Sequence, residues 1–203
     1  QILKNNKNGF SCLHKINEKI DYGNIIETSK FSSRSFNNPI DWQKKYIKVS
    51  ADMFKKNLSN LFTRKIISKK QSKTHSTYWP RLDTEIHGWI NWSWSGNDIV
   101  NFIKAFGDPY AGAHTLLNNE KIYLKNCKFK KIQKFHPFQF GIITNKTKNS
   151  IAVIVKDGII KIKNVYEKNG KKKKFRKLKV GDRLFSPNKK LNAALTKRVY
   201  FNL

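Results

Sequence analysis

The chain has 203 residues, with 42 Lys and Arg against 13 Asp and Glu, which gives a formal net charge of +29. This length can bury a real core and accommodates one or two domains. Its ordinary apolar content and 13% aromatic residues exclude wholesale disorder.

No apolar run approaches the roughly 18 residues of a membrane span, and the polar, cationic first residues do not resemble a signal peptide. Cys12 and Cys127 are far apart and lack the spacing of a metal site, which fits a reducing compartment. We therefore expect a cytoplasmic protein without a structural metal. Because the chain starts at Gln1 in what reads as the middle of an element, we also expect it to be a piece of a longer protein.

The first notable segment is HKINEKIDYGNII, residues 14–26, which places Asp21 beside Ile20 and just before a Tyr-Gly pair. The pattern predicts a tight turn that presents one carboxylate, with Gly23 allowing unusual backbone angles. An acid held beside apolar residues suits proton transfer. Turns of this kind are common, however, and His14 is as compatible with a structural role on a strand.

Residues 41–62 predict an amphipathic helix whose apolar stripe we expect to pack in the core: Ile47, Ala51, Phe54, Leu58 and Leu61. Residues 63–77 lose this pattern and gain Ser, Thr and Lys, as a linker does. A second helix is expected over 96–106, capped by Ser95 and ended by Gly107 and Pro109. Its expected buried stripe consists of Ile99, Phe102, Ile103 and Phe106.

Beyond residue 120 the sequence predicts strands, namely KIYLKNCKF, FQFGIIT, SIAVIVK, IIKIKNVYEK and shorter ones near the C-terminus. The Asp157-Gly158 pair between two β-branched runs predicts a hairpin. Several short strands in this span suggest a small barrel, for which an OB-like fold is the basic candidate.

The positive charge is concentrated in this half. Residues 121–203 carry 24 Lys and Arg against 3 acids, a net charge of +21, whereas residues 1–120 carry 18 against 10. The densest run predicts a nucleic-acid-binding surface formed by Lys171, Lys172, Lys173, Lys174, Arg176 and Lys177. A solvated loop in a lysine-rich protein is the alternative interpretation.

Two blocks resemble a known family. GFSCLHKINEKIDYGNII, residues 9–26, resembles a segment of the 10-formyltetrahydrofolate-dependent formyltransferases, in which an acid followed by x-Gly-x-Ile-Ile or Ile-Leu is typical. Residues 78–117, YWPRLDTEIHGWINWSWSGNDIVNFIKAFGDPYAGAHTLL, resemble the opening of the C-terminal domain of methionyl-tRNA formyltransferases and amino-sugar N-formyltransferases. The two blocks occur in the family's order.

The resemblance implies a fold and a division of the chain. Residues 1–62 would be the C-terminal part of an α/β catalytic domain, residues 63–77 a linker, and residues 78–203 an OB-like β-barrel domain. It also implies formyl transfer from 10-formyltetrahydrofolate to an amine. Asp21 matches the family's catalytic acid, and the loop that would border the folate is Asn17, Glu18, Lys19 and Ile20.

The resemblance is incomplete in ways that bear on activity. The family's Asn-x-His motif is absent from the chain, and we expect His75, His87, His114 and His136 to have core or surface roles instead. His87, Asn91 and Ala111 also depart from the family's usual residues. We therefore predict that these 203 residues do not catalyse formyl transfer by themselves.

The acceptor stays open at this point. The basic C-terminal half favours methionyl-tRNA, and hence a role in translation initiation, whereas the residues from Tyr78 to Ala113 resemble the amino-sugar enzymes at least as well. The amino-sugar acceptor would be a 4-amino sugar linked to a nucleotide. A third hypothesis is a non-catalytic RNA-binding module, with Tyr166, Phe175 and Phe185 available to stack on bases unless they are core residues. The sequence does not indicate the oligomeric state.

Overall fold

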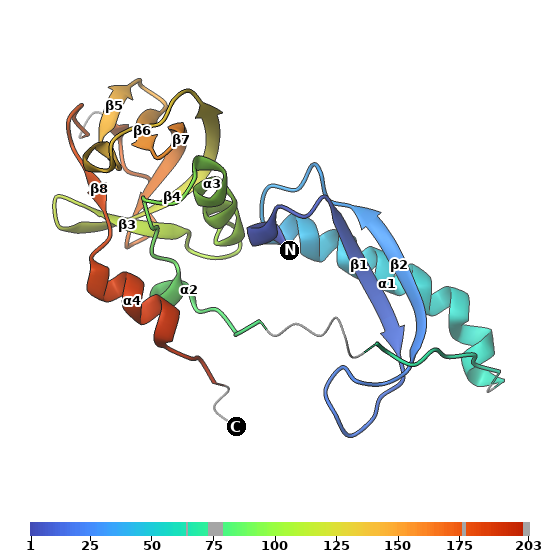
Figure 1. Ribbon diagram of the computed structural model, residues 1–203. Coiled ribbons are helices and arrows are strands. Elements are labelled where there is room, and N and C mark those ends of the chain that lie inside the picture. Colours follow the sequence, from blue (N-terminus) through green and yellow to red (C-terminus); the bar gives the residue numbers. More distant parts are fainter. Residues whose placement is uncertain (64, 73–78, 176–177, 201–203) are drawn as a thin grey trace. The chain divides into compact units, whose positions relative to one another are not determined.

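A computed structural model describes residues 1–63, 65–72, 79–175 and 178–200. The chain divides into two compact units (Figure 1). The first consists of Gln1, Asn6–Phe36 and Ile40–Trp79, and the second consists of Pro80–Leu203 together with the short segments Ile2–Asn5 and Asn37–Pro39.

The first unit is a β-hairpin packed on one long helix. Strands β1 (Asn8–His14) and β2 (Ile25–Ser32) pair antiparallel, and α1 extends over Pro39–Phe62. Phe31 packs edge-on against Trp42, with ring centroids 5.7 Å apart. Gly9 lies beneath these two rings, where a Cβ atom would overlap both of them.

The helix expected over 41–62 is confirmed, but its expected buried stripe is wrong. Ile47 is 59% exposed and Phe54 is 49% exposed. The hairpin instead contacts a face that includes Met53, which is 5% exposed, and Ser50, whose hydroxyl lies 2.8 Å from that of Ser11. The physical reason is that a two-stranded hairpin covers only a narrow face of a helix, so most of the apolar stripe faces solvent in this chain.

The second unit carries three helices. Thr84–His87 forms α2, Gly96–Ala105 forms α3, and Asn188–Thr196 forms α4. The expected α3 is confirmed, since the Ser95 hydroxyl accepts a hydrogen bond from the Asp98 amide at 3.2 Å. Its expected stripe is also buried, at 8% exposure or less. Two 3-10 turns, η1 (Ile2–Lys4) and η2 (Pro137–Gln139), complete the helical elements described in this unit.

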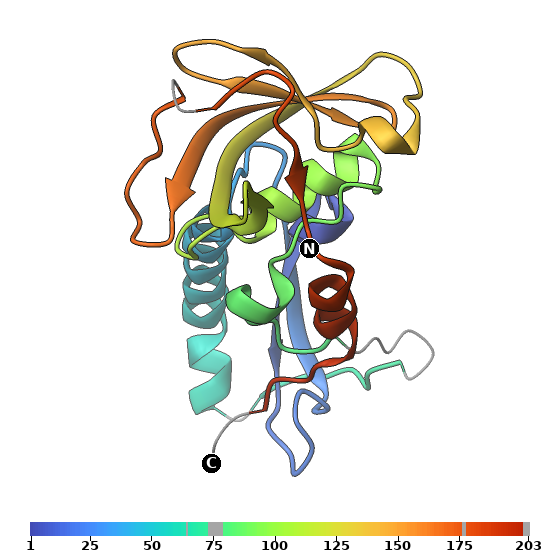
Figure 2. The same cartoon turned by 90° about the vertical axis from the view of Figure 1, so that its left-hand side faces the viewer.

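The sheet of the second unit has six antiparallel strands in the order β5-β6-β7-β4-β3-β8. Its strands are β3 (Ala113–Leu117), β4 (Glu120–Lys131), β5 (Ile143–Lys146), β6 (Ile151–Val155), β7 (Gly158–Glu167) and β8 (Leu184–Phe185). The sheet curls into a half-barrel, and α3 packs on it (Figure 2). The buried face of α3 and the inward residues of the strands form one continuous core.

The hairpin expected around Asp157-Gly158 is present, but its two turn residues are Lys156 and Asp157, because Gly158 already pairs with Val155 as the first residue of β7. The expected strand FQFGIIT is only partly correct, since η2 occupies Pro137–Gln139 and β5 begins at Ile143. His136 and Gln139 form a reciprocal capping box that holds this stretch in a turn. Near the C-terminus β8 is followed by α4, which the expectation of short strands did not include.

Within the described residues, no helix is both long and apolar enough to cross a membrane. The same part of the chain contains no group of three or more His, Cys, Asp or Glu side chains that could hold a metal ion.

Candidate functional site

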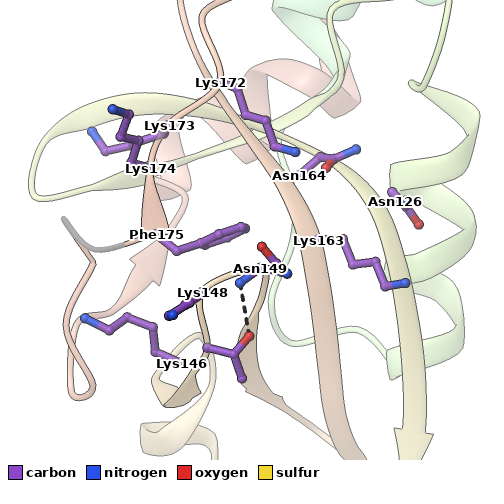
Figure 3. A pocket seen from close by; sticks show the side chains of 11 residues that line it. Asn126, Lys146, Lys148, Asn149, Lys163, Asn164, Lys172, Lys173, Lys174 and Phe175 are labelled. Carbon is purple, nitrogen blue, oxygen red and sulfur yellow. Dashed lines mark hydrogen bonds between the residues drawn. The ribbon is translucent and has the colours of Figure 1, made fainter.

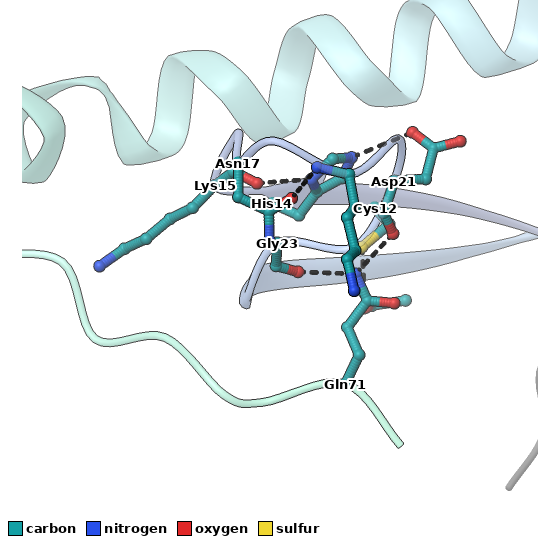
Figure 4. Close-up of polar contacts among 9 residues, drawn as sticks. Cys12, His14, Lys15, Asn17, Asp21, Gly23 and Gln71 are labelled. Atoms are coloured by element: carbon teal, nitrogen blue, oxygen red, sulfur yellow. Dashed lines mark hydrogen bonds and ion pairs between the residues drawn. The ribbon is translucent and has the colours of Figure 1, made fainter. Parts of the chain in front are cut away.

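The loop between β1 and β2 presents Asp21. This residue has a left-handed backbone with φ of 55°, a conformation that Asp tolerates better than most residues. Its carboxylate Oδ1 lies 3.5 Å from Nε2 of His14, the last residue of β1 (Figure 4). His14 Nδ1 lies 2.8 Å from the carbonyl oxygen of Lys15. The loop therefore brings together an imidazole and a carboxylate from residues that are seven positions apart in the sequence.

Gly23 fixes the shape of this loop. Its backbone lies so close to Lys15 that a Cβ atom would overlap the Lys15 carbonyl oxygen. The Lys15 amide donates to Asn24 O at 2.9 Å and closes the base of the loop. From a later segment, Gln71 donates its side-chain amide to the carbonyl oxygens of Asp21 at 2.9 Å and Gly23 at 2.6 Å (Figure 4). Gly23 thus acts through close backbone contact, and Gln71 is a supporting residue that the sequence did not single out.

The loop itself leaves Asp21 open to solvent. The Asp21 side chain is 86% exposed and that of Ile20 is 94% exposed. The apolar surroundings expected for this acid are therefore not provided by Ile20 in this chain. A dry environment for Asp21 requires that the loop be covered, by a bound molecule or by further residues of a longer polypeptide.

The four residues expected to border the folate, Asn17 to Ile20, lie in this loop and are all exposed. The Lys19 amide donates to the Asn17 side chain at 3.0 Å, which forms a local turn. In the described chain, no hydrogen bond is recorded for the peptide groups of Glu18 and Ile20. The loop thus offers free backbone donors and acceptors next to exposed apolar side chains, a combination suited to a flat heterocycle.

The lysine run of the second unit is an ordered edge rather than a free tail. The Lys173 amide donates to Val165 O at 2.8 Å, and its ammonium lies 2.6 Å from Glu120 Oε2. Lys173 is therefore 8% exposed and is held at the sheet edge. Lys171, Lys172 and Lys174 are exposed. Arg176 and Lys177, also expected to bind nucleic acid, lie outside the described residues, as do Tyr78 and His75.

A hollow of about 890 Å³ lies beside this run, and we call it the lysine groove (Figure 3). Its cationic lining is Lys146, Lys148, Lys163, Lys172, Lys173 and Lys174, and no acid lines it. Lys146 donates to Leu178 O at 2.7 Å, which leaves its charge unpaired by any carboxylate described in the structure. The groove is therefore a concave region of strong positive potential.

The aromatic residues suggested for base stacking have different positions. Phe175 is 5% exposed and belongs to the core, as the alternative interpretation held. Phe185 on β8 is 38% exposed. Tyr166 on β7 is partly exposed, and the Lys125 ammonium lies 5.6 Å from its ring centroid.

The histidines of the second unit have the core or surface roles expected of them. His87 accepts a hydrogen bond from the Asp83 amide at 2.8 Å through Nδ1, and its Nε2 lies 3.1 Å from Lys197 O. His136 caps η2. His114 is fully buried between the rings of Trp89 and Tyr123.

The pKa values of His114, Tyr123 and Glu85 are all shifted by their shared surroundings. Burial, and then the nearby Lys121 charge, lower the pKa of His114 to about 4. Burial, reinforced by a hydrogen bond to Glu85, raises the pKa of Tyr123 to about 12. The hydrogen bond from Lys121 holds the pKa of Glu85 below its ordinary value. His114 is therefore neutral at physiological pH and belongs to the packing of the domain.

The family comparison centres on the second unit. The formyl transferase C-terminal domain matches residues 84–182. The methionyl-tRNA formyltransferase of Caldicellulosiruptor saccharolyticus is 28% identical over 190 residues, which cover 90% of this chain and 60% of that protein. The chain thus spans about three fifths of this relative's length.

Two solved structures share the fold. WlaRD, a sugar 3N-formyl transferase whose crystal structure was determined in the presence of dTDP and 5-N-formyl-THF, has a TM-score of 0.63 and 25% identity, covering 80% of this chain and 57% of that one. HypX from Aquifex aeolicus has a TM-score of 0.60 and 15% identity, covering 82% of this chain and 29% of that one. At 15% identity HypX shows a similarity of fold alone.

Proposed function

We propose that the chain is part of an enzyme that transfers a formyl group from 10-formyltetrahydrofolate to an amine, because the formyl transferase C-terminal domain matches its residues 84–182. The observation that carries the proposal is the alignment of 90% of this chain with a methionyl-tRNA formyltransferase, a larger share than the C-terminal domain at residues 84–182 accounts for. We further propose that the half-barrel is OB-like, with residues 63–77 as the linker before it.

In this reaction the acceptor nitrogen attacks the formyl carbon and forms a tetrahedral oxyanion. The bond from that carbon to N10 of the folate then breaks, the attacking nitrogen loses a proton, and N10 gains one, so that the products are the formamide and tetrahydrofolate. We assign Asp21 to orient or accept that proton. Its carboxylate is exposed, and its backbone is held by the left-handed conformation and by the hydrogen bond from Gln71 to the Asp21 carbonyl, so the loop presents the acid from a defined position.

The folate donor is proposed to bind across Asn17–Ile20. The peptide groups of Glu18 and Ile20 are free to pair with the edge of the pterin, and the Ile16 and Ile20 side chains, 95% and 94% exposed, can pack on its face. A bound folate would also exclude water from the neighbourhood of Asp21, which strengthens electrostatic interactions there.

The preferred acceptor is the amino group of methionyl-tRNA, which would place the reaction in translation initiation in the cytoplasm. The supporting observation is the lysine groove, whose lining has no acid. Exposed lysines of the 171–177 run, Lys172 and Lys174 among them, would contact backbone phosphates.

A nucleotide-linked amino sugar is the alternative acceptor. It is favoured by the 25% identity and TM-score of 0.63 to a sugar 3N-formyl transferase. A small acceptor makes no use of a long cationic surface. Competition between methionyl-tRNA and a dTDP-linked amino sugar in one formylation assay distinguishes the two, because the true acceptor is formylated first.

The activity requires residues beyond these 203, since the Asn-x-His pair of the family does not occur in them. The test is a formylation assay on the 203-residue chain and on a longer polypeptide that joins it to the segment of the bacterial relative that it does not cover. We expect turnover only with the longer polypeptide, and turnover by the 203 residues alone would contradict the proposal.

The role of Asp21 is tested in that longer polypeptide. Asp21→Asn should lower kcat by about 100-fold or more, because the amide cannot accept the proton. Asp52→Asn, which removes an exposed carboxylate from α1, is the matched control and should leave kcat unchanged. Equal activity of the two variants would remove Asp21 from the mechanism.

A further inference from the structure

Strands β4 and β7 share a sequence feature that a regular strand does not have. Each contains a Lys-Asn pair between two apolar residues, LKNC at 124–127 and IKNV at 162–165. In a regular strand buried residues alternate with exposed ones. Here the buried residues are three apart, Leu124 and Cys127 on β4 and Ile162 and Val165 on β7.

The two interruptions coincide in the sheet. Lys125 pairs with Asn164 and Cys127 pairs with Ile162, so the two Lys-Asn pairs lie side by side in antiparallel strands. Asn126 has a left-handed backbone, with φ of 53°, which accounts for the break in alternation on β4. The register thus sets Lys125 opposite Asn164 and places Asn126 and Lys163 between the same two pairs. We call these four residues the Lys-Asn bend.

The Lys-Asn bend joins two hollows. Asn126, Lys163 and Asn164 line the lysine groove (Figure 3). Lys125, Asn126 and Asn164 also line a second hollow of about 470 Å³, together with Lys104, Lys128 and Tyr166. Because Asn126 and Asn164 line both hollows, the two hollows are adjacent on the surface of the second unit.

The chemistry of this surface combines cations with free amides. The acid of the second hollow, Asp108, is neutralised by Lys125 at 2.6 Å. Among the described residues, Lys128, Lys163 and Lys174 form no ion pair, and the side-chain amides of Asn126 and Asn164 form no hydrogen bond. Cations suit phosphates, whereas an amide offers both a donor and an acceptor, as the edge of a base does.

We infer that the lysine groove and the second hollow form one track for an unpaired polynucleotide strand, in which the lysines contact the phosphates and Asn126 and Asn164 contact base edges. The Lys-Asn bend is only two strands wide, or about 5 Å between neighbouring strands. A surface this narrow suits one strand better than a duplex, whose two backbones lie farther apart across either groove. The Watson–Crick edges of bases are open to such amides only where the strand is not paired.

This inference rests on the proposed function in one respect: the methionyl-tRNA acceptor identifies which RNA would bind. The track concerns residues of the second unit and needs neither Asp21 nor the folate. A chain that bound unpaired RNA but formylated an amino sugar would therefore refute the proposed acceptor and leave the track intact.

The charge part is tested by fluorescence anisotropy with the 203-residue chain and a labelled single-stranded RNA of roughly ten nucleotides. Lys163→Ala should weaken binding by about fivefold and lower the slope of log affinity against log salt by about 0.7. The matched control is Lys189→Ala on α4, an exposed lysine that lines neither hollow, and it should leave both quantities unchanged. Equal losses in the two variants would mean diffuse attraction and would overturn the track.

The amide part is tested with Asn126→Gly combined with Asn164→Ala. Glycine keeps the left-handed backbone of residue 126 without strain and removes the amide. We expect binding of the RNA to weaken by about fivefold with an unchanged salt slope. Binding of an abasic strand of the same length should not change, which also shows that the variant is folded. Equal losses for the RNA and the abasic strand would overturn base contact by the amides.

A fully paired RNA hairpin of the same composition distinguishes single strands from duplexes. It should bind at least about tenfold more weakly than the open strand at the same salt concentration. Tighter binding of the hairpin, with the same dependence on Lys163, would overturn the inference in favour of a duplex-binding surface.

Discussion

The two units bury their apolar residues very differently. In the described part of the first unit the buried apolar side chains are Phe31 and Met53, whereas the second unit has a continuous cluster contributed by α3 and the strands. The first unit also leaves Ile47 and Phe54 exposed on α1. A helix and a hairpin have too little shared surface to enclose a core, whereas a curled sheet with a helix on it encloses one.

The difference shows where each unit gets its shape. The first unit depends on a few close backbone approaches, such as those at Gly9 and Gly23, and on the Phe31–Trp42 contact. The second depends on many apolar contacts that reinforce one another. The stability of the first unit should therefore be low and sensitive to single contacts, while the second should tolerate more.

The largest effect is expected for Gly23→Ala. A methyl group there overlaps the Lys15 carbonyl, so the loop has to open, at a cost above about 4 kcal/mol. Hydrogen-exchange mass spectrometry should show loss of protection in residues 8–32 and unchanged protection in the sheet of the second unit. Gly107→Ala is the control, since its backbone is not left-handed and its Cβ would come no closer than 3.1 Å to the Lys104 carbonyl oxygen, which a small shift accommodates. Unaltered protection of the hairpin would show that the first unit is less constrained than its contacts indicate.

A slightly smaller effect is expected for Leu124→Ala in the second unit. Leu124 is 0% exposed, and its truncation should lower the free energy of unfolding by about 3 kcal/mol through the cavity it leaves. Urea denaturation followed by tryptophan fluorescence measures this change. Leu195→Ala on α4, where the side chain is 82% exposed, should cost less than about 0.5 kcal/mol. Similar values for the two leucines would contradict a single dominant core.

The second unit should also lose stability in mild acid through His114. Its pKa of about 4 in the folded state is below the ordinary 6.5, so the unfolded state binds the proton first as the pH falls. The free energy of unfolding should therefore fall by about 3 kcal/mol between pH 6.5 and pH 4. Urea denaturation across this range checks the fall. A His114→Gln variant should be less stable at neutral pH but should lack this part of the slope, and an unchanged slope would place the titration elsewhere.

The smallest effect is expected on the exposed face of α1. Ile47→Ser should change the free energy of unfolding of this chain by less than about 0.5 kcal/mol, because Ile47 is 59% exposed. Met53→Ser, on the face that contacts the hairpin, should cost about 2 kcal/mol or more. Hydrogen exchange of residues 39–62 compares the two variants. A larger effect at Ile47 than at Met53 would restore the burial expected from the sequence.

The accuracy of the sequence-based expectations follows the range of the interactions involved. The α3 helix, its Ser95 cap and the hairpin around Asp157-Gly158 depend on neighbours within a few residues, and all three are present. The stripe of α1 was misjudged because helical periodicity defines an apolar face without showing what covers it. The turn at Pro137–Gln139 was missed because the apolar residues of this segment suggest a strand, whereas the capping box of His136 and Gln139 favours a turn.

The candidate site shows the same division. The sequence pointed to Asp21 and Gly23 through a local turn pattern, but it did not indicate Gln71, which reaches the loop from 48 positions beyond Gly23. The composition of the sequence identified the lysine run, but it did not show that Lys173 forms an ion pair with Glu120. The repeated Lys-Asn pairs were visible as letters, yet only strand pairing shows that they are adjacent.

By itself, the sequence determined the resemblance to formyltransferases, the positive charge of the second half and the turn that presents Asp21. These features depend on residue identity and on short-range backbone preferences. Tertiary structure alone decided which face of α1 is covered, which lysines of the groove form ion pairs, and which asparagines lie beside them. Those outcomes depend on pairing between residues far apart in the chain, and local periodicity carries no information about the partner.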